Sequence, residues 1–200
     1  MIVLEDLRKE FGGLVAVEGI DLEIPAGEFF AFIGPNGAGK TTTIKMITGL
    51  LRPTRGRVVL CGHDMQEDYI AAKSVLSYVP DQPYLYDKLT GREFLQFVAR
   101  MYGLPDSETR ERIDRWSATF ALEDFLDELG ETYSHGMKQR VVISAALLHD
   151  PQVIVVDEPL VGLDPQGASV LKDVLNDCAA QGKSIFMSTH TLSLAEDVAS

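Results

Sequence analysis

Apolar and polar residues alternate near the start of the chain in a way that predicts short strands. Period-two and short apolar runs cover residues 2–7, 19–24 and 28–33. Such runs indicate β-strands, and Pro25-Ala26-Gly27 predicts a turn before the third. Residues 57–61 and 75–79 repeat the signal farther along. The first part of the chain is therefore expected to be β-rich.

The middle of the chain changes to a helical period. Apolar residues recur on two helical faces: Phe94, Phe97, Val98 and Met101, then Ile113, Trp116 and Phe120. Spacings of three and four residues indicate amphipathic helices. We expect a separate helical lobe at approximately residues 88–135.

The last third alternates helices and strands. A helix is predicted after Gly136 as far as residue 148, a strand at 153–156, a helix at 166–180 and a strand at 184–187. The apolar β-branched run at 153–156 is typical of a parallel strand buried on both faces. This order predicts a doubly wound α/β core.

Composition narrows the class of protein. The chain has 200 residues, 46% hydrophobic and 24% charged, which favours one ordinary domain with a real core. Its net charge of -12 repels phosphate backbones, so we expect no nucleic-acid partner. The apolar runs are shorter than the roughly 18 to 20 residues that a membrane span needs. No signal-like start is visible, so a cytoplasmic location is expected.

A glycine-rich segment lies between the predicted strand 28–33 and a predicted helix at 40–50. It reads Gly34, Pro35, Asn36, Gly37, Ala38, Gly39, Lys40 and Thr41, and Thr42 follows. This pattern is the phosphate loop of P-loop NTPases, in which backbone N–H groups and a helix N-terminus surround the phosphates. Lys40 is expected to neutralise the β- and γ-phosphates, and Thr41 to bind Mg²⁺. An ordinary glycine turn is the alternative. ATP or GTP binding is predicted.

Two carboxylates end the apolar strand 153–156. Asp157 and Glu158 come at the edge where open α/β sheets bind their ligands. Asp157 is suited to hold Mg²⁺ through water, and Glu158 to polarise the water that attacks the γ-phosphate. The alternative is a solvated acidic turn before Pro159.

A third group of motifs resembles the ABC ATPase family. The residues that carry the resemblance are the signature-like Tyr133-Ser134-His135-Gly136-Met137-Lys138-Gln139-Arg140, the D-loop-like Gly162-Leu163-Asp164-Pro165 and the switch-like Ser188-Thr189-His190. Phe11 resembles the aromatic residue on which the adenine stacks. The resemblance implies an α/β P-loop NTPase core with a mostly parallel sheet, an N-terminal antiparallel β subdomain and a small helical lobe, in one domain over residues 1–200.

The resemblance also assigns roles that have ordinary alternatives. Ser134 and the N–H of Gly136 would donate to a γ-phosphate bound by a facing subunit, and Asp164 would lie at the same nucleotide; Ser134 could instead only cap a helix. His190 would donate to the γ-phosphate, whereas a lone histidine is more often structural. Phe11 could be a core residue.

Three features depart from the family pattern. Where relatives usually have a glutamine, this chain has Asp81 at the aligned position with Gln82 beside it. An oxygen of either residue could approach Mg²⁺ or its water, and Gln82 is our candidate ligand. The signature has His135 where glycine is frequent and Met137 where glutamine is frequent. The chain ends at Ser200, soon after His190, so we expect that the C-terminal strands of relatives are missing.

The resemblance implies an ATPase that pairs with itself or a relative around two MgATP and drives membrane permease subunits from the inner face of the cell membrane. Tyr84-Leu85-Tyr86 is a candidate permease contact, or it is buried in the chain's own core. The signature and D-loop look more like those of exporters. Two alternatives are an ABC ATPase that acts on ribosomes or nucleic acid, and a catalytically inactive regulatory cassette.

Overall fold

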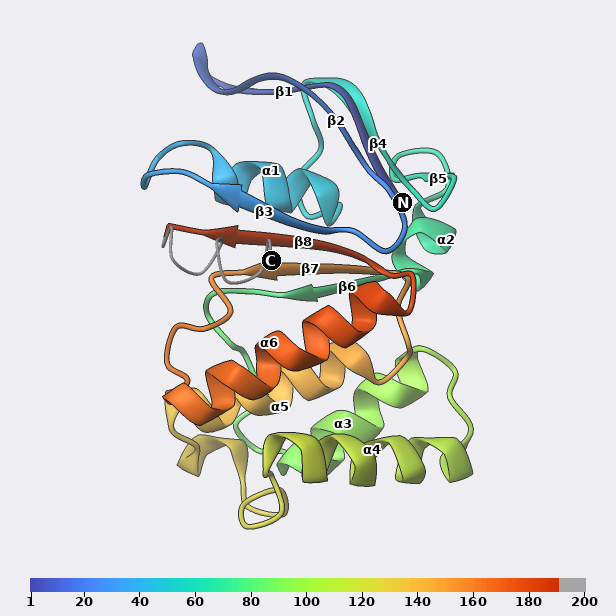
Figure 1. Cartoon of the computed structure of the whole chain (residues 1–200), viewed down its shortest axis with the longest axis vertical. Coiled ribbons are helices and arrows are strands. Elements are labelled where there is room, and N and C mark those ends of the chain that lie inside the picture. The colour runs from blue at the N-terminus through green and yellow to red at the C-terminus, as the bar shows by residue number, and fades with distance from the viewer. Residues whose placement is uncertain (191–200) are drawn as a thin grey trace. The chain divides into compact units, whose positions relative to one another are not determined.

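The computed structural model describes residues 1–190 (Figure 1). Within it the chain divides into two compact units. Unit 1 comprises Met1–Tyr78, Gln152–Glu158 and the chain from Val174 onward. Unit 2 comprises Val79–Pro151 and Pro159–Asp173. The helical lobe expected at 88–135 lies within unit 2, whose bounds are wider.

Unit 1 opens with an antiparallel sheet, as predicted. Its strands are β1 (Ile2–Phe11), β2 (Leu14–Ile24), β4 (Arg55–Leu60) and β5 (His63–Asp64), in the order β2-β1-β4-β5. Ile2 and Leu4 are buried, because side chains on one face of a strand recur every second residue. Leu7 is also buried, although it comes three residues after Leu4, because the strand is irregular between Leu4 and Leu7. This face of the sheet joins the hydrophobic core of the unit.

A second sheet carries the chain segments with candidate chemistry. Its strands are β3 (Phe29–Ile33), β8 (Ser184–Thr189), β7 (Val153–Asp157) and β6 (Leu76–Val79), in the order β3-β8-β7-β6. β8 is parallel to both β3 and β7. Every residue of β7 and β8 is buried, which confirms the predicted parallel strand covered on both faces.

The helices follow the predicted order, with one addition. They are α1 (Lys40–Ile47), α2 (Tyr69–Ser74), α3 (Gly91–Met101), α4 (Asp106–Phe120), α5 (His135–Leu147) and α6 (Pro165–Ala180), with a 3₁₀ turn at Gly130–Thr132. In unit 2, α3 and α4 both pack on α5. The hydrophobic pattern does not predict α2 or β5, which are too short to show a period. No helix within residues 1–190 is long and apolar enough to cross a membrane.

Candidate functional site

Three strand ends of unit 1 lie side by side and bring the candidate catalytic segments together. Ile33 at the end of β3 pairs with Thr189 of β8, and Asp157 at the end of β7 pairs with Ser188. The arrowheads of β3, β8 and β7 point the same way in Figure 1. The phosphate loop follows β3, Glu158 follows β7 and His190 follows β8. The edge predicted from sequence therefore exists in the structure.

The phosphate loop is held in a conformation that requires glycine. Gly37 and Gly39 have φ angles of 83° and 86°, in the left-handed region. A Cβ on Gly39 would lie 2.6 Å from the carbonyl oxygen of Ala16, in β2. Gly39 is also the N-cap of α1 and supplies no side-chain acceptor to the first turn. The first N–H groups of α1 therefore have no side-chain cap and can serve an anion.

Lys40 lies across the loop rather than extending into solvent. It is only 8% exposed, and its Nζ donates to the carbonyl oxygens of Gly34 and Pro35 at 2.6 and 3.1 Å. Thr41 is exposed and Thr42 is half-buried at the start of α1. The loop residues from Pro35 to Ala38 are exposed, whereas Gly34 and Gly39 are half-buried. The loop thus forms a turn around one ammonium group.

The two carboxylates at the end of β7 have different surroundings. Asp157 is 2% exposed, and its Oδ1 accepts a hydrogen bond from the Ser188 hydroxyl. Glu158 has a φ of 48°, and its backbone N–H donates to the Ser188 carbonyl at 3.1 Å. A non-glycine residue in this region is uncommon and often marks a functional position. The buried carboxylate is fixed, whereas the second one turns out of the strand.

Glu158 and His190 form a contact that sequence alone did not predict. The Nδ1 of His190 lies 2.8 Å from Oε1 of Glu158. The glutamate side chain is mostly buried and the histidine is more than half exposed. Ser188 joins this group through Asp157 and was considered only as part of the switch motif. The contacts Glu158–His190 and Asp157–Ser188 both follow from the register of β7 and β8, and a single sequence does not give that register.

The oxygen donors at this edge suit Mg²⁺. Thr41 offers a hydroxyl and Asp157 a carboxylate, both hard ligands of the kind that Mg²⁺ prefers. Within residues 1–190 no cluster of three or more His, Cys, Asp or Glu could hold a metal. Mg²⁺ usually takes few protein ligands and completes its shell with water and substrate phosphates. The residues present therefore fit this ion.

In unit 2, Ser134 begins helix α5. Its Oγ accepts a hydrogen bond from the N–H of Met137 at 3.2 Å, and its own N–H lies 3.4 Å from the Met137 sulfur. This arrangement is a capping box in which sulfur replaces the usual oxygen. The helix-capping interpretation of Ser134 is thus confirmed. The cap uses the serine oxygen as acceptor, so the hydroxyl proton can still be donated.

The start of α5 packs directly against the D-loop segment. A Cβ on Gly136 would lie 2.6 Å from the carbonyl oxygen of Gly162, and a Cβ on Gly162 would lie 2.1 Å from Cδ2 of His135. Gly162 has a φ of 84°. Asp164 accepts from the N–H of Gly167 at 2.6 Å, at the start of α6. The two motifs form one surface, with His135 as the contact that the sequence did not reveal.

Tyr133 fixes the signature segment from the inside. Its hydroxyl donates to the carbonyl of Phe125 at 2.7 Å and accepts from the N–H of Gly91 at 3.1 Å. Burial raises the pKa of Tyr133, opposed by the hydrogen bond from Gly91. The neutral phenol therefore anchors the start of α5 to the start of α3.

Phe11 and the Asp81-Gln82 pair are the remaining candidates. Phe11 is 48% exposed at the end of β1, with the Lys9 ammonium 5.0 Å from its ring centre. The alternative that Phe11 is a core residue is therefore wrong. Asp81 and Gln82 are both exposed and belong to unit 2. Their approach to Mg²⁺ remains a prediction.

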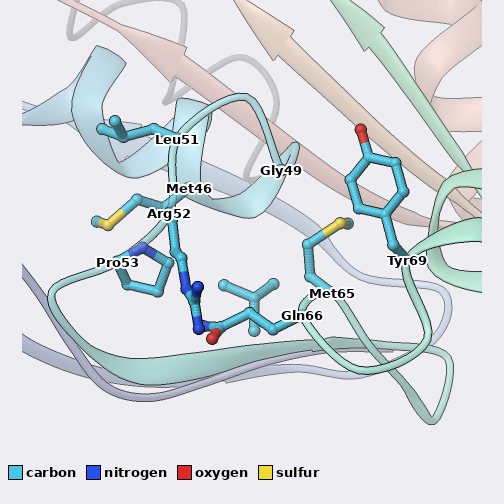
Figure 2. Close-up of a pocket in the computed structure, with 9 residues that line it drawn as sticks. Met46, Gly49, Leu51, Arg52, Pro53, Met65, Gln66 and Tyr69 are labelled. Carbon is cyan, nitrogen blue, oxygen red and sulfur yellow. The ribbon is translucent and has the colours of Figure 1, made fainter.

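A separate hollow of about 240 Å³ lies in unit 1 around the end of α1 (Figure 2). Its lining is mostly apolar and includes Met46, Leu51, Pro53 and Met65. A Cβ on Gly49 would lie 2.6 Å from the Met65 sulfur, so this glycine is needed for close packing. The hollow is at the opposite end of α1 from the phosphate loop, and its lining includes the charged side chain of Arg52.

Comparisons with known proteins agree on one family. The family model described as ABC transporter matches residues 17–161. An uncharacterized ABC transporter ATP-binding protein of Nostoc sp. is 37% identical over 207 residues, which cover 99% of this chain and 61% of that protein. Across the first curated relatives, the chain spans 61 to 64% of their length.

Solved structures give the same result. The ATP-binding subunit of an ABC transporter is similar with a TM-score of 0.93 and 36% identity, covering 98% of this chain and 82% of that one. The dimeric post-hydrolysis state of an ATP-binding cassette bound to ADP and Pi has a TM-score of 0.87 and 27% identity, covering 98% and 90%. The predicted fold class is therefore confirmed.

Proposed function

Because the chain belongs to the ABC transporter family, we propose that it is an ATP-binding and ATP-hydrolysing subunit that drives substrate movement through membrane permease subunits. The observation that carries the proposal is the common edge of β3, β8 and β7. It presents Lys40, Glu158 and His190 from the three segments that follow these strands in unit 1. These are the groups needed to bind a triphosphate and to position water beside it.

Binding depends on the phosphate loop. The left-handed glycines Gly37 and Gly39 let backbone N–H groups face the phosphates, and the uncapped start of α1 adds its positive end. Lys40 would exchange its bonds to the Gly34 and Pro35 carbonyls for phosphate oxygens. Thr41 and Asp157 would hold Mg²⁺, which neutralises phosphate charge when bound. Gln82 is proposed as a further ligand.

Hydrolysis is assigned to Glu158. Its Oε1 is fixed by His190 at 2.8 Å, and its backbone by Ser188. A carboxylate in this place can orient a water molecule and accept its proton. The exposed His190 would donate to the γ-phosphate from the ring edge that does not face Glu158. The intact acid and histidine argue against an inactive regulatory cassette.

A complete site requires two copies of the chain or a close relative. Ser134, Gly136 and Asp164 belong to unit 2, on the surface formed by the signature and D-loop segments. We propose that this surface closes over a nucleotide held by the facing subunit, while Phe11 stacks on the adenine. The dimeric cassette bound to ADP and Pi supports this arrangement.

An exposed aromatic surface in unit 2 is the proposed contact with the permease. Tyr84 is 70% exposed, and its ring lies 5.7 Å from that of Tyr86, which lies 5.8 Å from Phe97 of α3. Leu85 between the tyrosines is buried and holds the segment in place. Clustered apolar exposure of this kind marks interaction sites. Binding here would place the protein at the inner face of the membrane.

The test of function is the ATPase rate of Glu158→Gln. Loss of the carboxylate should lower the rate by about 10²- to 10⁴-fold, because a positioned base contributes that factor. ATP binding, measured by calorimetry with Mg²⁺, should remain. Glu123→Gln, which changes an exposed glutamate, is the matched control. Undiminished turnover in Glu158→Gln would refute the assignment.

The partner is tested by purification of the native complex from membranes. We expect an integral-membrane protein to copurify, and Tyr84→Ser with Phe97→Ser to release it without changing ATP binding. Recovery with ribosomes instead would favour the alternative of a ribosome-associated ATPase. That alternative has less support, since the relatives above are named as transporter ATP-binding proteins.

A further inference from the structure

A pocket of about 340 Å³ opens in unit 2 between the end of α3 and the start of α4. Its lining comprises Gln96, Arg100, Asp106, Thr109 and Arg110. None of these residues belongs to the motifs assigned to nucleotide or permease. The pocket is therefore a second candidate site with its own chemistry.

Two arginines of the pocket lack the partners that most other arginines have. Five arginines pair with carboxylates, namely Arg8, Arg55, Arg57, Arg92 and Arg112. Arg115 and Arg140 contact aromatic rings, and Arg52 is unpaired within residues 1–190. Within residues 1–190, the side chains of Arg100 and Arg110 make no hydrogen bond, ion pair or ring contact. Acidic residues outnumber basic ones by 30 to 18, so carboxylates are not scarce. The pocket keeps two guanidinium groups available.

Helix α4 begins at this pocket without a side-chain cap. Its N-cap is Pro105, which has no side-chain acceptor, and the first backbone bond runs from the N–H of Thr109 to the Pro105 carbonyl at 2.8 Å. The N–H groups of the preceding first-turn residues therefore have no partner within the helix. The helix has 15 residues, so its N-terminus carries a substantial positive end.

A buried hydroxyl adds an independent signal. Thr109 is 4% exposed, and its Oγ1 has no hydrogen-bond partner among the described residues. Leaving a buried hydroxyl unpaired is costly, so such groups usually have a partner. Thr109 is also one of the residues that line the pocket. The amide of Gln96 supplies a further donor on the wall formed by α3.

We propose that this pocket binds the phosphate group of a small phosphate ester. Two guanidinium groups and a helix N-terminus are the donors that tetrahedral oxyanions prefer. The Asp106 carboxylate would repel a bound anion, but the two guanidinium groups of Arg100 and Arg110 outweigh its single negative charge. Glu108, on the same turn, is engaged by Arg112. The volume exceeds that of inorganic phosphate, which leaves room for an organic group.

The experiment follows backbone amides 106–109 of the whole chain by ¹⁵N NMR. The Lys40→Ala variant is used, so that phosphate bound at the nucleotide loop does not contribute. The probes are inorganic phosphate, glycerol 3-phosphate, and phosphatidylcholine vesicles with or without phosphatidic acid. Saturable shifts with a soluble probe support a soluble ligand. Shifts confined to phosphatidic acid vesicles support a lipid headgroup. No shift with any probe overturns the proposal.

Charge variants test the assignment of the residues. Arg100→Gln with Arg110→Gln should weaken binding by at least about tenfold, since lost charge-assisted hydrogen bonds cost that factor or more. Asp106→Asn should tighten it. Arg52→Gln is the matched control, because Arg52 is exposed and also unpaired within residues 1–190. Unchanged affinity in the double variant, with a spectrum that shows it folded, would rule the site out.

Discussion

Two helix starts in this molecule are assigned to the nucleotide phosphates, and they are built differently. At α1, Gly39 is the N-cap and no side chain accepts from the first turn. At α5, Ser134 accepts from Met137, and Met137 returns the contact through its sulfur. The first start offers bare N–H groups. The second presents a hydroxyl that already serves the helix and can donate its proton outward.

Each start is also held by a glycine, against different neighbours. Gly39 meets the backbone carbonyl of Ala16. At the start of α5, Gly136 likewise meets the backbone carbonyl of Gly162, but Gly162 meets the side chain of His135. A backbone neighbour cannot be removed by mutation, but a side chain can. We infer that the phosphate loop of unit 1 is fixed by the fold, and that the signature surface of unit 2 can be tuned by one residue.

The largest expected effect is at the start of α1, whose first N–H groups have no side-chain cap. Lys40→Ala should weaken MgATP binding by about 10- to 150-fold, because a hydrogen bond to a charged group contributes about 1.5 to 3 kcal/mol. Titration calorimetry measures the affinity. Lys45→Ala, an exposed lysine on the same helix, is the control and should bind normally. Equal affinities for both variants would remove Lys40 from the site.

Much of the site at the start of α1 could be predicted from sequence, because the residues that bind phosphate there are consecutive. Eight consecutive residues specify the loop, and the flanking periods predict the strand and the helix on either side. That Asp157, Glu158 and His190 lie at one edge of the sheet could be predicted from the rule that parallel strands end at the same edge. The contact of Glu158 with His190 also depends on register, which hydrophobic pattern does not give for strands buried on both faces.

The surroundings of the start of α5 were less predictable, because the contacts there join segments that are distant in sequence. His135 and Gly162 are far apart in sequence, and nothing local links them. Ser134 had two interpretations, and the geometry allows both at once, since capping uses the oxygen and phosphate recognition the proton. The short elements α2 and β5 were missed for a related reason, as their positions depend on packing rather than period.

The second prediction separates the two glycines. Gly162→Ala should lower the free energy of unfolding by about 1 to 3 kcal/mol through backbone strain and the clash with His135. Adding His135→Ala should recover the part due to the clash. Gly39→Ala should be destabilising as well, with no recovery from His135→Ala. Urea unfolding of the single and double variants measures these terms. Additive effects of Gly162→Ala and His135→Ala would contradict the contact.

The third prediction separates the two roles of Ser134. Ser134→Ala should cost about 0.5 to 2 kcal/mol of stability through loss of the cap. Ser134→Asp keeps an acceptor for the Met137 N–H but has no proton to donate and adds charge, so it should stay stable and lose ATPase activity. Ser134→Thr preserves both functions and is the control. Full ATPase activity in Ser134→Asp would mean that Ser134 only caps α5 and does not contact the nucleotide.

The smallest expected effect comes from the returning half of the cap. A thioether is a weak acceptor, and the sulfur of Met137 lies 3.4 Å from the Ser134 N–H. Met137→Gln places an amide oxygen there and completes the usual capping box. We expect a gain of about 0.3 kcal/mol, at the low end for a designed cap. The midpoint of thermal unfolding should therefore rise slightly in Met137→Gln, and the gain should vanish in the Ser134→Ala background if the two residues act as one cap. A gain that persists there would mean that glutamine stabilises α5 by another contact, and that the two halves of the cap are independent.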